Sequence, residues 1–399
     1  MFLGISPLLR STVSLSLLLG LTRAVAQTSP ASSSAVEVAY ITSNGAVETW
    51  NVDPQTGLPT DQGQTLVPPV YFSLVPSADD HFVYITGTDP SSNTEKLWVY
   101  ATGANGVLQV KPIQKLSLPN GTSNLTIAPS GTFAYAVHAQ LNSQNYEVSA
   151  ILLFHVNPTT GTLFGRTVVT KYPPGGLCNS QLDDGYPSLI GFNSKETQLY
   201  DSWYCSFHES GSVNYYALQV NPSTGSLSAG TEIFSWGIST GGGFDTVDFT
   251  PKNLIDFQVP NDYQIGINSV NVYPPNGGTT PTFTCDASML EACGYGLNMH
   301  VDPSGKFIFL QTSTDNTQET KLNLTAKQIV STPYYLPDTL QAFSPDDTLI
   351  YAQSPNNGNP PFIYPVYTFD SVTGALGTTN GAQIYTQQPF STLVPALRK

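Results

Sequence analysis

The chain has 399 residues, and its 14 Lys and Arg against 28 Asp and Glu give a formal net charge of −14. Because nucleic acids and anionic membranes bind through Lys and Arg, this balance argues against both as partners. Only 11% of the residues are charged, whereas 33 Gly and 31 Pro accompany 40% hydrophobic residues. That composition excludes a mainly helical or a disordered chain and indicates a folded protein of short strands and many turns.

The first 26 residues have the pattern of a secretory signal peptide. A short segment ending at Arg10 precedes an apolar run over 11–21, and Ala24-Val25-Ala26 forms a cleavage site. The apolar run is shorter than the roughly 20 residues that a membrane-spanning helix needs. We therefore expect a monomer that is secreted, or periplasmic in a Gram-negative host, with a signal peptide at 1–26, a short disordered tail at 27–35 and one folded domain over 36–399.

A turn followed by a strand that ends in an aromatic residue recurs along the rest of the chain. Clear copies are APSGTFAY (128–135), TPKNLIDF (250–257), DPSGKFIF (302–309) and SPDDTLIY (344–351), and weaker copies are SADDHFVY (77–84) and NSKETQLY (193–200). With a copy at 36–40 that lacks its turn, the terminal aromatics are Tyr40, Tyr84, Tyr135, Tyr200, Phe257, Phe309 and Tyr351. Seven copies at this spacing predict an all-β protein, a seven-bladed β-propeller with four short strands in each blade.

A second motif places Asp or Asn before a turn that ends in Thr-Gly. It occurs at 50–58, 154–163, 218–227 and 367–376, and it predicts a hairpin each time because Gly accepts the positive φ of such turns. The segment FSTLVPA (390–396) also repeats FSLVPS (72–77), with no blade left after it. We therefore expect the C-terminal strand to pair with the strand at 36–43 and to close the ring, which hides both edges.

The longer insertions should all lie on the face opposite the tight turns, at the mouth of the propeller channel. They cover 138–147, 172–186, 203–211 and 277–296 and contain every cysteine. In an exported chain without metal-binding Cys spacing, we expect the disulfides Cys178–Cys205 and Cys285–Cys293. Asn120, Asn124 and Asn323 lie in glycosylation sequons, which matter only in a eukaryotic host. Long loops held by disulfides are where a small-molecule or glycan ligand is expected.

Two histidines are the candidate catalytic bases: His138 at the end of a second strand, and His300 in an innermost strand. Either could instead be a packed structural histidine. Asp183 and Asp184 could serve as an acid/base pair or bind a structural calcium, or they could be solvated loop residues. No cofactor is expected. The other candidate binding residues could instead be solvated polar loop residues or aromatic residues packed between blades. They are Trp203, Tyr204, His208, Glu209, Trp236, Asp286 and Glu291.

The repeat pattern over 36–399 resembles the lactonase-type seven-bladed β-propeller family. This family includes the cycloisomerase-like 6-phosphogluconolactonases and the carboxy-cis,cis-muconate lactonising enzymes. The resemblance implies a lactonase-type hydrolase or a cycloisomerase. Family members that act on anionic substrates carry Pro-Arg-His or Pro-His pairs in their innermost strands. Aligning the turns puts other residues at the histidine position: Ser73, Asn124, Leu189, Thr246, Asn298 and Leu340.

Arginine is scarce in the mature chain. Removing the signal peptide leaves only Arg166 and Arg398, and neither is expected in the channel, where a carboxylate or phosphate would need a guanidinium partner. We therefore expect a neutral or cationic lactone as substrate. The alternative is a non-catalytic extracellular propeller that binds a glycan, a peptide or a protein on its loop face.

Overall fold

The computed structural model describes residues 36–398 except 44, 69, 142–146, 172–183, 194, 208–209, 239–244, 250–253, 259–268, 274–282, 286–297, 314–315, 324–327, 330–333, 356–360, 378–381 and 387–391, with some strand residues described by their backbone alone. Every regular element in the described part is a β-strand. All of these strands belong to one compact unit, Ala35–Lys399.

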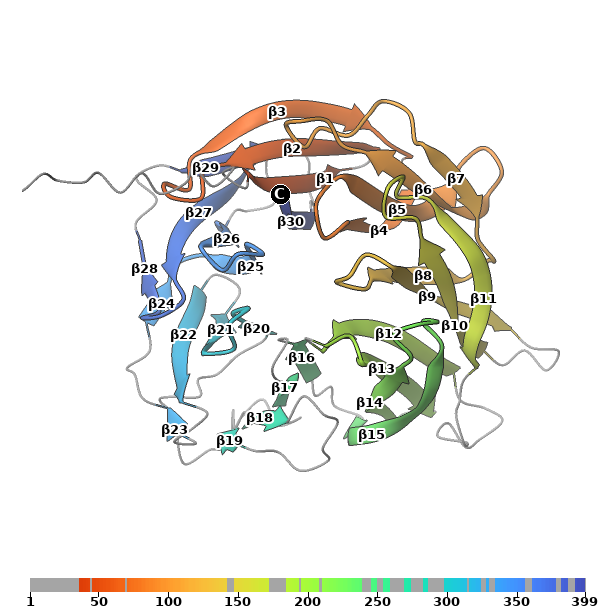
Figure 1. Ribbon diagram of the computed structural model, residues 1–399. Coiled ribbons are helices and arrows are strands. Elements are labelled where there is room, and N and C mark those ends of the chain that lie inside the picture. Colours follow the sequence, from red (N-terminus) through yellow and green to blue (C-terminus); the bar gives the residue numbers. More distant parts are fainter. Residues whose placement is uncertain are drawn as a thin grey trace, which may run out of the picture. The chain divides into compact units, whose positions relative to one another are not determined.

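The strands form antiparallel sheets of four or five members (Figure 1). The first sheet has the order β3 (Pro59–Leu66), β2 (Ala46–Val52), β1 (Val36–Ser43) and β30 (Thr392–Arg398). The second contains β4 (Val70–Pro76), β5 (Phe82–Asp89), β6 (Thr94–Ala101) and β7 (Gln114–Ser117). The third contains β8 (Thr122–Ile127), β9 (Phe133–Leu141), β10 (Glu147–Val156) and β11 (Leu163–Lys171).

The remaining sheets continue in chain order. They are β12 (Asp184–Phe192), β13 (Gln198–Phe207), β14 (Ser210–Val220) and β15 (Leu227–Ile238); then β16 (Asp245–Phe249), β17 (Leu254–Gln258), β18 (Ser269–Tyr273) and β19 (Phe283–Cys285). Next come β20 (Asn298–Val301), β21 (Phe307–Ser313), β22 (Asn316–Asn323), β23 (Gln328–Ile329) and β24 (Tyr334–Leu336), and last β25 (Thr339–Phe343), β26 (Leu349–Gln353), β27 (Phe362–Asp370), β28 (Ala375–Leu376) and β29 (Gln383–Thr386).

The C-terminal strand lies beside the first strand, as the sequence predicts. β30 pairs antiparallel with β1 in a register that runs from Val36 opposite Arg398 to Thr42 opposite Thr392. Successive sheets contact one another through their first strands, such as β4 with β8 and β16 with β20, and β30 contacts both β25 and β4. Figure 1 shows these first strands on the inner side of the sheets and strands such as β3 and β11 on the outer side.

The turn between the first and second strand has the same hydrogen bonds in successive sheets. The backbone N–H of Ser77 donates to the carbonyl of Phe82 at 2.8 Å, and that of Ala128 donates to Phe133 at 2.9 Å. The fourth residue of each of these turns that the structure describes has a positive φ, which L-residues rarely adopt. This position holds Asp80, Gly131, Glu196, Gly305 and Asp347. We call the end of each sheet with these turns its turn end, and the opposite end its loop end.

The predicted hairpins are confirmed, and they also lie at the turn end. In the β2–β3 hairpin, Asp53 Oδ1 accepts hydrogen bonds from the backbone N–H groups of Gln55 and Thr56 at 2.9 and 2.8 Å. Asn157, Asn221 and Asp370 accept equivalent bonds in their own hairpins. Because the side chain closes the turn locally, these hairpins can be predicted from short stretches of sequence.

The core consists of side chains packed between neighbouring sheets. The repeated tyrosines Tyr40, Tyr84, Tyr135, Tyr200 and Tyr351 are completely buried. A glycine in a hairpin of one sheet can pack closely against core side chains of the preceding sheet, as Gly225 does against Phe133 and Leu153. A Cβ atom on Gly225 would lie 2.7 Å from Phe133 Cδ1 and 2.9 Å from Leu153 Cδ1, distances that real Cβ contacts do not tolerate. Glycine is therefore required there by the contact between sheets as well as by its φ of 69°.

This requirement gives a matched pair of substitutions. Gly131 has the same backbone conformation, with a φ of 68°, but a Cβ there would meet no atom within 4 Å. We expect Gly131→Ala to cost about 1 kcal/mol from backbone strain alone. Gly225→Ala should cost about 2 to 4 kcal/mol, because overpacking is added to the same strain. Urea unfolding midpoints measure the difference, and equal losses would refute the proposed contact between sheets.

Candidate functional site

His138 lies at the loop end of β9, with its side chain 8% exposed. Its cross-strand neighbour is Thr122, the first residue of β8, whose backbone N–H donates to Glu95 Oε2. Glu95 comes from β6 of the preceding sheet, so this hydrogen bond joins two sheets beside His138. Sequence reasoning missed Glu95, since nothing in its local sequence distinguishes it from other strand carboxylates.

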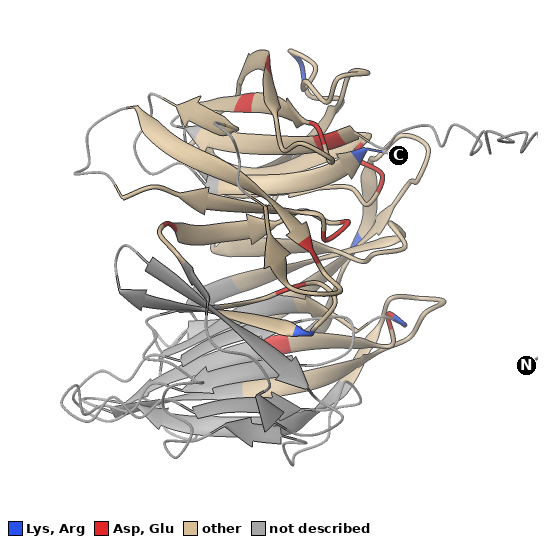
Figure 2. Ribbon diagram, turned by 90° about the vertical axis from the view of Figure 1, so that its left-hand side faces the viewer, with Lys and Arg blue, Asp and Glu red and all other residues tan. Residues whose placement is uncertain are grey.

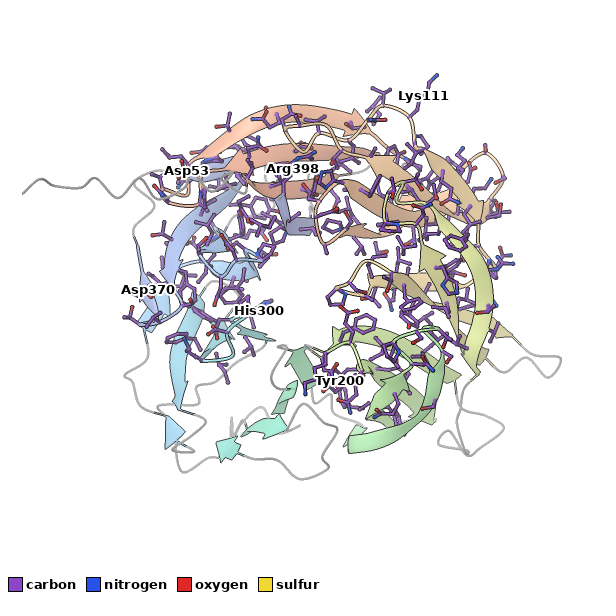
Figure 3. The ribbon with its side chains drawn as sticks, in the orientation of Figure 1. Asp53, Lys111, Tyr200, His300, Asp370 and Arg398 are labelled. Carbon is purple, nitrogen blue, oxygen red and sulfur yellow. The ribbon has the colours of Figure 1, made fainter. Side chains whose placement is uncertain are left out.

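His300 lies in β20, the first strand of its sheet, where the sequence placed it. Its side chain is partly exposed, and Figure 3 shows it on the inner side of the sheet. Burial lowers the pKa of His300 to about 4. The imidazole is therefore neutral at every pH above that value and keeps a lone pair that can accept a proton.

The structure does not bring the two histidines together. They belong to sheets that are separated in chain order by the sheets of β12–β15 and β16–β19. His300 lies two residues before Asp302, the first residue of the turn between β20 and β21, so it is close to the turn end of its sheet. His138 pairs with Thr122 at the far end of β8, about 16 Å along the strand from the turn at a rise of about 3.3 Å per residue. One small substrate could contact only one of them.

Several other predicted binding residues lie in strands whose side chains are not described. Asp184 is the first residue of β12 and pairs with Ser206. Trp203 and Tyr204 are in β13, and Trp236 is in β15, where it pairs with Val213 of β14. The remaining predicted residues lie outside the described residues: Asp183, His208, Glu209, Asp286 and Glu291.

The predicted disulfides also lie beyond what the structure describes. Cys205 is in β13, opposite Gly185 of β12, and Cys285 ends β19, so both are at the loop end of their sheets. Cys178 and Cys293 are outside the described residues. Of the sequon asparagines, Asn120 and Asn124 are exposed.

Among the carboxyl groups that the structure describes, Glu37 has the most strongly raised pKa, and the sequence did not single this residue out. Its side chain, at the start of β1, is completely buried. Glu37 Oε1 accepts a hydrogen bond from the Tyr351 hydroxyl at 3.2 Å, while Oε2 has no partner. Burial, with a smaller contribution from the charge of Asp346, raises the pKa of Glu37 to about 9. Glu37 therefore holds a proton at neutral pH, and its burial prevents any contact with a substrate.

A related group occupies the next turn along the chain. The Tyr40 hydroxyl donates to Asp80 Oδ1 at 2.8 Å and lies 3.0 Å from the carbonyl oxygen of Gly106. Arg398 Nη1 donates to Thr102 Oγ1 at 2.7 Å and to the Asp80 carbonyl at 3.3 Å. Burial raises the pKa of Asp80 to about 7. These contacts connect β1, β30 and the second sheet at the turn end.

Both arginines of the expected mature chain are held away from the loop end. Arg398 is held at the turn end, as described above, and Arg166 Nη1 donates to the carbonyl of Ser117 on the outer strand β7. Figure 2 shows that most acidic residues of the described part also gather towards the end of the sheets where the chain terminates. In the described residues, no three His, Cys, Asp or Glu side chains are grouped so that they could hold a metal ion. The described residues also contain no helix that is long and apolar enough to span a membrane.

Comparison with known proteins identified relatives through structure alone. No family model matches the sequence, and no curated protein matches it. A Bacteroides fragilis protein described as a candidate 6-phosphogluconolactonase aligns with a TM-score of 0.58 at 15% identity, covering 92% of this chain and 99% of its own. The periplasmic gluconolactonase of Pseudomonas aeruginosa aligns with a TM-score of 0.57 at 12% identity, covering 90% and 99%.

A second candidate 6-phosphogluconolactonase, from Bacteroides uniformis, gives a TM-score of 0.55 at 16% identity and covers 90% of this chain and 99% of its own. The similarity to this group that the repeat predicts is therefore confirmed at the level of the fold. The chain folds as an all-β protein with the architecture of the lactonase-type β-propellers. Identities this low carry no substrate from these proteins to this one.

Proposed function

We propose that this protein is a secreted seven-bladed β-propeller, formed by residues 36–399 and closed by β30, that hydrolyses a small uncharged lactone with His300 as general base. The position of His300 carries the proposal. It is a partly exposed imidazole on an innermost strand, and its low pKa keeps it unprotonated. The first strands of a propeller surround its central channel, so a ligand there can contact several sheets at once.

Hydrolysis of a lactone by water requires a general base and polar groups that bind the substrate. The neutral imidazole accepts a proton from a water molecule while the water oxygen attacks the lactone carbonyl. When the tetrahedral intermediate collapses, the ring C–O bond breaks and the departing oxygen takes the proton back from His300. The product is an open-chain hydroxy acid, and the base is regenerated.

An uncharged ring is favoured because the two arginines are engaged elsewhere. Arg398 Nη1 donates to Thr102 Oγ1 and to the Asp80 carbonyl, and Arg166 Nη1 donates to the Ser117 carbonyl. A carboxylate or phosphate on the substrate would enter a strongly acidic protein without a bidentate cationic partner. The similarity to a periplasmic gluconolactonase, an exported protein that is named for a lactone, supports the same choice.

The test is turnover of a panel of neutral lactones by the protein purified without residues 1–26, with and without EDTA. We expect His300→Ala to lower kcat by about 10² to 10⁴-fold, the usual contribution of a general base. His138→Ala is the matched control, since His138 belongs to a different sheet, and it should retain activity. Because His300 stays neutral down to a pKa of about 4, kcat/KM should fall below about pH 4 and not near pH 6.5.

Each other outcome has a defined meaning. Full activity in His300→Ala together with loss in His138→Ala would transfer the catalytic role to the loop end beside Glu95. Absence of turnover across the panel would end the lactonase proposal. It would favour the alternative, a non-catalytic extracellular propeller that binds a glycan, a peptide or a protein through its loop face.

A further inference from the structure

The turn that follows His300 is held by one buried aspartate. Asp302 is completely buried and begins the turn between β20 and β21. Its Oδ1 accepts hydrogen bonds from the backbone N–H groups of Lys306 and Phe307 at 2.7 and 2.6 Å, and its Oδ2 accepts one from the N–H of Ser304 at 3.1 Å. Because β20 is only four residues long, the Asp302 carboxylate fixes the path of the chain just beyond His300.

The strand beside His300 packs against the following sheet, β25–β29. Phe309 of β21 lies opposite His300 and is completely buried. Its ring centroid is 5.2 Å from that of Phe343 in β25 and 5.9 Å from that of Phe369 in β27. Because protein interiors are close-packed and transmit strain, a displacement at this contact reaches the neighbouring strand. The interface between these two sheets therefore positions the backbone of His300.

A second buried aspartate, Asp347, enters this interface from the following sheet. It holds the fourth position of its turn, as Asp80 does in the second sheet, and its side chain is 8% exposed. Asp80 accepts a hydrogen bond from the hydroxyl of Tyr40 in the preceding sheet. In the sheet that precedes Asp347, the position of Tyr40 is held by Phe309, which has no hydroxyl. Asp347 Oδ1 has no hydrogen-bond partner within the protein.

The titratable group that faces Asp347 is the carboxyl of Asp302. Burial, the charge of Asp302 and a hydrogen bond with its carboxyl raise the pKa of Asp347 to about 7, against smaller opposing effects of Ser304 and Ser371. Two adjacent buried carboxyl groups resist ionising together, so this pair shares one proton at neutral pH. The other described charged groups around the pair are all exposed: Lys306, whose Nζ donates to the Ser371 carbonyl at 2.9 Å, Asp346 and Asp370.

We propose that Asp302 and Asp347 are positioning residues for His300: they hold one shared proton across the interface between the two sheets, and loss of that proton moves β20 and His300 away from the lactone. The inference rests on the role proposed for His300 above.

The direction of the pH effect follows from Asp347. A carboxyl with a raised pKa stabilises the folded contact fully below its unfolded value of 3.8, and this stabilisation is lost as the pH rises through about 7. Two negative charges then repel each other in a buried contact. Asp302 can move away only by weakening its hydrogen bonds to the turn that follows β20. Activity is therefore limited by His300 in acid and by the aspartate pair in alkali.

The experiment combines the pH profile of kcat/KM on a neutral lactone with an NMR titration of protein labelled with ¹³C at histidine Cε1. His300→Ala identifies the His300 resonance, and circular dichroism verifies folding at each pH. We expect kcat/KM to fall by about tenfold from about pH 6 to 8.5, because small displacements of a catalytic group are costly. The His300 resonance should show an inflection near pH 7, separate from its own titration near pH 4.

Asp347→Asn imitates the protonated pair, because its amide donates to Asp302 at every pH. This variant should keep kcat/KM within about twofold over the same range and should lack the inflection near pH 7. Asp80→Asn is the matched control. Asp80 holds the same turn position in another sheet and also has a pKa of about 7, so its replacement should leave both the alkaline fall and the inflection in place.

The NMR titration requires no turnover, so this proposal and the lactonase proposal can fail separately. Absence of turnover together with the inflection near pH 7 would end the lactonase proposal and still support the coupling of the aspartate pair to His300. Turnover without that inflection in the parent protein would overturn the pair and leave the lactonase standing, and this result needs no variant to fold. An inflection retained in Asp347→Asn, or lost in Asp80→Asn, would also overturn the pair.

Discussion

Deleting residues 389–399 should abolish cooperative folding. The deletion removes β30, which pairs with β1 along its length and buries Leu393 and Ala396 between sheets. It also removes the Arg398 hydrogen bonds to Asp80 and Thr102, which join the first and second sheets. Burial of a leucine side chain contributes about 1.5 to 3 kcal/mol and burial of an alanine methyl group under about 1 kcal/mol, and the edge of β1 would become exposed.

These losses are comparable with the whole stability of a protein domain, which is about 5 to 15 kcal/mol. Far-UV circular dichroism and thermal denaturation of the truncated protein measure the effect. Arg398→Ala is the matched control, because it removes the guanidinium bonds and keeps the strand, and it should still unfold cooperatively at a lower temperature. A truncated protein with the melting temperature of the full chain would show that the pairing of β30 with β1 does not stabilise the fold.

Stability should fall steeply as the pH rises from 4 to 9. Glu37 has a pKa of about 9 in the folded protein against 4.5 when unfolded, and Asp80 has a pKa of about 7 against 3.8. A carboxyl with a raised pKa in the folded state contributes its full stability below the unfolded value and loses it as the pH rises towards the folded value. By pH 7 the loss at Glu37 is of the order of 3 kcal/mol.

Glu37→Gln isolates this effect, because an amide can still accept the Tyr351 hydrogen bond and does not ionise. We expect the variant to resemble the parent near pH 4 and to be more stable by a few kcal/mol at pH 8, measured by urea unfolding across the pH range. Asp53→Asn is the control. Asp53 lies in an exposed turn, where backbone N–H groups lower its pKa, so its replacement should leave the loss at high pH in place. Parallel pH profiles for parent and Glu37→Gln would show that burial of Glu37 does not govern the slope.

Much of the fold could be predicted from the sequence because its determinants are local. Asp53 and Asn157 close their hairpins with their own side chains. Each recurring tyrosine identifies the second strand of its own sheet, counted from the inner side. The position of His300 in a first strand followed from the same repeat. The pairing of the C-terminal strand with the first strand also followed, because the chain contains one copy of the first-strand motif at its end.

The sequence could not reveal the groups that depend on contacts between sheets. Glu37 and Tyr351 are 314 residues apart, and Tyr40 meets Gly106 across 66 residues; no short-range pattern connects such pairs. Asp80 and Gly131 are interchangeable in a local reading, because both fit a turn position with positive φ. Only the tertiary structure shows that Asp80 accepts a hydrogen bond from Tyr40 of the preceding sheet, whereas Gly131 has open space where a side chain would lie. The repeated turns and hairpins, which are encoded locally, thus predicted the architecture, while the packing of each sheet against the next decided which polar groups are buried and which carboxyls stay protonated.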